Sequence, residues 1–150
     1  MTKGSIDLKA VGDRLAIVAS CLASLRLLPS DRPEDFRADW RNAAAADSLR
    51  RRAIEALFDA ARHILAKAFG LGPLEYRDVA RLSAEKGLVR GAEAQARMRE
   101  IAGFRNRLTH FYDEVTTDEI LGITRDQLGD LEHLAEEIRQ AAARLAPPGG

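Results

Sequence analysis

The residues of this chain that are best suited to chemistry lie in one stretch of eight, Arg105 to Tyr112, with the sequence RNRLTHFY. The stretch holds one of the chain's three histidines, together with a guanidinium group and a phenol. An imidazole titrates near neutral pH, and a guanidinium presents a planar fork of hydrogen-bond donors. Such groups serve proton transfer and anion binding, so this stretch is the first candidate for a site.

Helical spacing divides the stretch into an apolar and a polar side. At about 100° per residue, four residues fall on one stripe that can face a core: Ile101, Phe104, Leu108 and Phe111. Asn106 and His110 are four positions apart and project together from the opposite side. His110 is therefore not predicted to be a core histidine.

Arg105 and His110 converge poorly on one straight helix, because they lie about 140° apart around its axis. Arg105 and Tyr112 share a line at the edge of the apolar stripe, near Met98. Either the helix ends near His110, or two copies of the chain combine across a two-fold axis, and we favour the second arrangement. The spacing also allows a plain alternative, a solvated helix end whose Arg and His complement the helix dipole.

Length and charge set broad limits on the protein. A chain of 150 residues is expected to form one domain at 1–146, followed by a flexible tail at 147–150. Its 23 basic and 23 acidic residues leave no net charge, so bulk electrostatics predict no nucleic-acid partner. Between Glu85 and Tyr112, however, six basic residues face only three glutamates. The candidate site therefore lies in a locally basic segment.

The single cysteine, Cys21, excludes an internal disulfide and favours a reducing compartment. Residues 1–15 lack the apolar core of a signal peptide, and no stretch reaches the roughly 18 apolar residues that a spanning helix needs. We therefore expect a cytoplasmic protein with no membrane partner.

Apolar residues recur at spacings of three and four over most of the chain, which predicts helices. The first seam contains Leu8, Val11, Leu15, Val18, Leu22 and Leu25, and Pro29 stops it. The segment 35–69 has no Gly or Pro and predicts one long helix, or two with a kink. A short helix over 75–85 and the helix of the candidate site follow.

The last helix is predicted over 128–145, with Thr124 and Gln127 as a capping box before it and Thr117 as a further cap. No stretch predicts a strand. The expected fold class is all-α, an up-and-down bundle of four to five helices.

The run 49–138 resembles the HEPN superfamily, and within it the HepT-like toxins of prokaryotic toxin–antitoxin pairs. Arg105, His110 and Tyr112 match the R-x4-H-x-Y motif of that family. Further similarity lies in Gly103-Phe104 before the motif, Asn106 within it, the helical segment 52–64, and Asp130-Leu131-Glu132 at the start of the last helix.

The resemblance implies a metal-independent endoribonuclease acting as a homodimer, with the motif of each protomer facing its partner across a shared cleft. RNA cleavage without a metal needs a group that takes the 2′-OH proton, a group that protonates the leaving 5′-oxygen, and a cation at the phosphate. In this scheme His110 is the general acid or base, and Arg105 holds the phosphate. Asn106 orients the imidazole or a phosphate oxygen, and Arg107 attracts the RNA backbone.

The resemblance also implies a partner, a minimal nucleotidyltransferase antitoxin that attaches AMP to Tyr112. Added phosphates beside Arg105 would compete with RNA for the guanidinium. The alternative is that Tyr112 packs its ring at the edge of the apolar stripe, with its hydroxyl at the rim.

Neither a metal nor a cofactor is expected, because the histidines and Cys21 show no metal-binding spacing and 70–73 lacks the Lys of a phosphate loop. His63 is predicted to pair with Asp59, four residues earlier, and His133 to be solvated. The basic run 50–52 is expected to form a solvated patch.

Two other functions remain open at the level of sequence. One is a catalytically silent HEPN protein that binds a nucleotide or a nucleotidyltransferase. The other is a helical interaction module whose apolar seams only build a dimer, which predicts that His110→Ala leaves every phenotype unchanged. The intact Arg105, His110 and Tyr112 favour the active ribonuclease over both.

Overall fold

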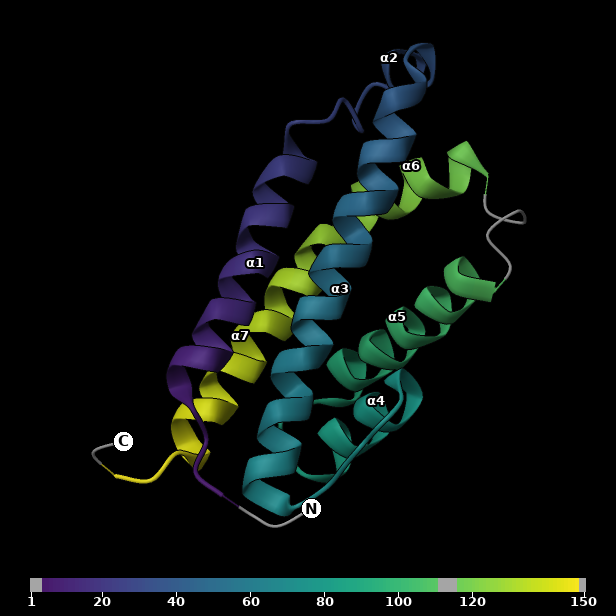
Figure 1. The fold of residues 1–150 in the computed structure, drawn as a ribbon. Helices are drawn as coiled ribbons and strands as arrows, with labels where there is room; N and C mark the ends of the chain where they lie inside the picture. The colour runs from purple at the N-terminus through teal and green to yellow at the C-terminus, as the bar shows by residue number, and fades with distance from the viewer. Residues whose placement is uncertain (1–3, 111–115, 149–150) are drawn as a thin grey trace.

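The computed structural model describes residues 4–110 and 116–148, with residues 105–110 described by their backbone alone. The described residues form seven helices and no strand, which confirms the all-α prediction (Figure 1). The helices are α1 (Leu8–Arg26), α2 (Pro33–Ala38), α3 (Trp40–Phe69), α4 (Tyr76–Glu85), α5 (Ala92–His110), α6 (Thr117–Asp126) and α7 (Leu128–Leu145). None of them has an apolar stretch long enough to cross a membrane.

The long helices α1, α3 and α7 lie side by side and enclose much of the core (Figure 1). α4 and α5 pack against each other, while α6 packs on α3 and leads into α7. Half of the largest fully buried apolar side chains come from α3, which therefore forms the centre of the fold: Leu25, Phe36, Ile54, Leu57, Phe58, Ile64, Leu65, Leu88, Met98 and Ile101.

The segment 35–69, for which one long helix or two with a kink were predicted, is divided between α2 and α3. α3 runs unbroken for 30 residues and is capped at Gly70, whose φ of 69° is the left-handed conformation that glycine adopts without strain. Its start differs from the sequence expectation, because Asp39 is extended and its carboxylate accepts a hydrogen bond from Arg41 N at 3.0 Å. This cap separates the short α2 from α3 without any Gly or Pro.

Of the two caps predicted near the last two helices, the one at Thr117 is displaced by one residue and the one at Thr124 is wrong. The N-cap of α6 is Thr116, not Thr117, and its hydroxyl accepts from Glu119 N at 3.1 Å. Thr124 does not cap α7: it is fully buried, and its hydroxyl donates to Ile120 O at 2.7 Å within α6. The extra helices α2 and α6 account for seven helices where four to five were expected.

Candidate active site

The predicted site residues lie in the last turns of α5, where that segment is described. The backbone of Arg105, Asn106, Arg107 and His110 is helical, while their side chains lie outside the described part of the chain. Tyr112 also lies outside the described residues. One helix therefore carries the first four of these residues.

The core fixes this helix from its other side. Met98, Ile101 and Ala102 are buried, which confirms the predicted apolar stripe at Ile101. Phe104, one turn further on, is half-buried, and the guanidinium carbon of Arg50 lies 4.7 Å from the centre of its ring. The residue immediately before Arg105 is thus held by a side chain of α3.

A groove of about 490 Å³ runs beside the motif, between α5 and α6. Gly103 and Phe104 form its α5 wall, together with the carboxylate of Glu100, and Asp118 lies on its α6 side. Both of these carboxylates have cationic partners, since Glu100 lies 3.2 Å from Arg97 Nη1 and Asp118 lies 2.7 Å from Arg37 Nε. The acidic rim is thereby partly neutralised next to the basic motif.

Arg50 is the residue near this site that sequence reasoning missed. It was expected in a solvated patch, yet it is only 1% exposed, whereas Arg52 is exposed and Arg51 pairs with Asp47 at 3.2 Å. Burial lowers the pKa of Arg50 to about 10. The available signal was its position four residues from both Ala46 and Ile54, on the buried stripe of α3.

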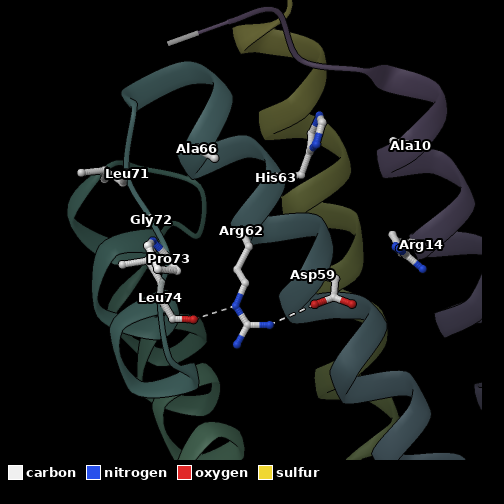
Figure 2. Close-up of a pocket in the computed structure, with 10 residues that line it drawn as sticks. All are labelled: Ala10, Arg14, Asp59, Arg62, His63, Ala66, Leu71, Gly72, Pro73 and Leu74. Carbon is white, nitrogen blue, oxygen red and sulfur yellow. Dashed lines mark hydrogen bonds and ion pairs between the residues drawn. The ribbon is translucent and has the colours of Figure 1, made fainter. Parts of the chain in front are cut away.

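A second cleft, of about 480 Å³, lies between α1, α3 and the loop 71–74 and shares no lining residue with the groove beside the motif (Figure 2). The prediction that His63 pairs with Asp59 is wrong here. His63 Nε2 accepts a hydrogen bond from Asp7 N at 2.9 Å, and Asp59 accepts one from Arg62 Nη1 at 2.9 Å. Arg62 Nε also donates to Leu74 O at 2.9 Å. The bonds of His63 and Arg62 thus connect α3 to the residue before α1 and to the loop before α4.

The pKa of His63 is lowered, first by burial and then by the nearby charge of Lys67. His133 is exposed, with Nε2 3.9 Å from a Glu137 carboxylate oxygen. Within residues 4–110 and 116–148, so far as their side chains are described, no three His, Cys, Asp or Glu side chains are grouped to hold a metal ion.

Comparison with known families and structures adds to this geometry. The family described as Ribonuclease HepT-like matches residues 19–138, which is well over half of the chain and includes the entire candidate motif. A search of curated proteins found no match.

Three similar solved structures come from toxin–antitoxin systems. One, a toxin–antitoxin with AMP-PNP, has 22% identity and a TM-score of 0.75, and the match covers 86% of this chain and 97% of that one. A tri-AMPylated Shewanella oneidensis HEPN toxin in complex with MNT antitoxin has 21% identity and a TM-score of 0.76, over 87% and 97% of the two chains.

The third is a tyrosine-to-alanine mutant of the toxin–antitoxin MntA–HpeT, with 21% identity, a TM-score of 0.76, and coverage of 87% of this chain and 98% of that one. At this level of identity the three structures define the fold. The helical arrangement of this chain is therefore a HEPN fold over nearly its full length.

Proposed function

The chain belongs to the HepT-like ribonuclease family, and from this premise we propose that it is a metal-independent endoribonuclease toxin that acts as a homodimer. The observation that carries the proposal is the R-x4-H-x-Y motif. It falls within the matched residues, and α5, which carries its Arg105 and His110, is anchored in the core by Met98 and Ile101.

The proposed reaction uses the 2′-OH of the RNA itself as nucleophile. One copy of His110 takes the 2′-OH proton as the oxygen attacks phosphorus, and the His110 of the second protomer protonates the 5′-oxygen as its bond to phosphorus breaks. The products are a 2′,3′-cyclic phosphate and a 5′-OH. Arg105 neutralises the charge that develops on the phosphate oxygens, and a planar guanidinium suits this role better than Lys.

Two further residues support this scheme on the same helix. Asn106 is proposed to orient the imidazole or a phosphate oxygen, because it lies one helical turn from His110. Arg107 is proposed to attract neighbouring RNA phosphates, so its contribution should weaken as salt concentration rises. Sharing the cleft between two copies overcomes the angle between Arg105 and His110 on one helix.

We further propose that a minimal nucleotidyltransferase antitoxin neutralises the toxin by transferring AMP from ATP to the hydroxyl of Tyr112, with release of pyrophosphate. The support is a structural neighbour that is itself a tri-AMPylated HEPN toxin in complex with MNT antitoxin. Phosphates on Tyr112 would compete with RNA for Arg105. Incubation with such an enzyme and ATP should add AMP to the wild type but not to Tyr112→Phe, as read by mass spectrometry. Equal labelling of both proteins would contradict the assignment.

The test of the nuclease is cleavage of total RNA in EDTA by the purified, unmodified protein. Arg105→Ala and His110→Ala should each lower the rate by about a hundredfold or more, while both remain folded and dimeric. Arg99→Ala, an exposed arginine on the same helix, is the matched control and should cleave at nearly the wild-type rate. Absence of cleavage by the wild type would favour the catalytically silent nucleotidyltransferase-binding protein instead.

A further inference from the structure

Arg50 is a buried charge that the proposed reaction does not use. Its guanidinium donates from Nη2 to Gln127 Oε1 at 3.0 Å and covers the ring of Phe104 at 4.7 Å. Its Nε atom is buried and has no hydrogen-bond partner. The charge of Asp47 acts on Arg50, but the hydrogen bonds of that carboxylate go to Arg51.

This arrangement is unfavourable for the stability of the fold alone. A buried charge is normally paired with an opposite charge and fully hydrogen-bonded, because otherwise it loses its hydration without compensation. The lowered pKa of about 10 reflects this loss, yet it leaves Arg50 charged at neutral pH. An apolar side chain of similar length would fill the same space on the stripe of α3 without that penalty.

The hydrogen bond of Arg50 and its contact with an aromatic ring both lead to the candidate active site. Phe104 immediately precedes Arg105, and Gln127 is the residue at which α6 gives way to α7. Both residues also line the groove beside the motif. One side chain of α3 therefore connects the motif helix, the α6–α7 junction and the wall of the groove.

The charge of Arg50 also has a favourable location for binding an anion. Arg105 to His110 lie in the last turns of α5, where the carbonyl end of the helix carries a partial negative charge that repels phosphate. A cation under Phe104 offsets this repulsion, and its field is weakly screened because Arg50 is shielded from water.

We propose that Arg50 is a positioning residue of the ribonuclease site, which holds the turn of α5 that presents Arg105 and supplies a buried positive charge for the RNA phosphate. This inference rests on the proposed nuclease function. In this account Arg50 is retained because it contributes to RNA cleavage, although its buried charge is unfavourable for folding.

The test compares Arg50→Met and Arg50→Lys with the wild type, and measures thermal unfolding together with kcat and KM for RNA cleavage in EDTA. Arg50→Met should unfold at the same or a higher temperature, while its kcat/KM falls by about tenfold. Arg50→Lys keeps the charge, so its KM should return close to the wild-type value. Its kcat should stay below that of the wild type, because the bond from the guanidinium to Gln127 is lost. Arg52→Met, the same change at an exposed position two residues away, should alter neither property.

Two results would overturn the inference alone. In the first, the wild type cleaves RNA and Arg50→Met cleaves it equally well. In the second, Arg50→Met unfolds at a lower temperature or fails to fold, which would make Arg50 a structural residue. A wild-type protein that cleaves no RNA would overturn the proposed function, and this inference with it.

Discussion

Two arginines of α3 occupy similar positions against aromatic rings but in opposite surroundings. Arg62 lies 4.8 Å from the centre of the Tyr76 ring, and Arg50 lies 4.7 Å from that of Phe104. Arg62 is bonded to the Asp59 carboxylate and to Leu74 O, and its side chain is 30% exposed. Arg50 has one bond to a neutral amide and is 1% exposed.

The difference separates a charge that supports folding from one that does not. The bond from Arg62 Nε to Leu74 O connects α3 to the loop before α4, two segments that the fold must hold together. The contacts of Arg50 reach the helix that carries the motif, and no carboxylate of the described side chains forms an ion pair with its guanidinium, since Asp47 pairs with Arg51. A similar stacked geometry thus contributes to stability at one end of α3 and, in our account, to the active site at the other.

The largest expected effect is at the Arg62 end of α3. Phe58 is fully buried, and its ring centre lies 4.8 Å from that of Tyr76, the ring that Arg62 covers. Phe58→Ala should lower the free energy of unfolding by about 3–5 kcal/mol, because it removes a large buried side chain and leaves a cavity. Phe104→Ala, at a half-buried position, should lower it by less than half as much. If urea unfolding gave equal losses of free energy for Phe58→Ala and Phe104→Ala, the packing around Arg62 and around Arg50 would not differ as we describe.

A smaller effect is expected from matched substitutions of the two arginines. Arg62→Met should lower the free energy of unfolding by about 1 kcal/mol, since it removes a partly exposed ion pair and a bond to the chain. Arg50→Met should lower it by nothing or raise it. Urea denaturation of both variants measures the difference, and a loss of similar size in each would remove the distinction between them.

The smallest expected effect is a pH dependence of stability that originates at His63, next to Arg62 on α3. The pKa of His63 is lowered in the folded state, so below its ordinary value of 6.5 the unfolded state binds more protons and stability falls as pH falls. Protonation would also break the bond that His63 Nε2 accepts from Asp7 N. The melting temperature should therefore decrease between pH 7.5 and about pH 5.5 by more in the wild type than in His63→Gln. Identical profiles for the two proteins would contradict this origin.

Local patterns in the sequence predicted most of the helices and much of the core. The seams of α1 and α3 are visible in sequence because helical periodicity is a local property, and Val11, Val18, Leu22 and Leu25 are buried as expected. The position of the break between α2 and α3 was not predicted, because it depends on the side chain of Asp39 rather than on Gly or Pro.

Features that depend on tertiary partners were predicted less well. The burial of Arg50 requires Phe104 and Gln127, which lie far from it in sequence, and neighbouring charges suggested a solvated patch. His63 was assigned to the nearest carboxylate, whereas the fold brings the backbone of Asp7 to its ring. Spacing did identify the motif segment of α5, since that pattern lies within one helix.

The most direct test of the central claim is to mix the wild-type and His110→Ala proteins in varying ratios at constant total concentration, under conditions in which dimers exchange subunits, and to measure RNA cleavage in EDTA. The His110→Ala dimer lacks both imidazoles and should be inactive, and a mixed dimer keeps only one of the two that the proposed reaction uses. Our account therefore predicts that activity falls as the square of the wild-type fraction. Activity that falls in direct proportion to the wild-type fraction, although mixed dimers are present, would contradict an active site built from two copies of the chain.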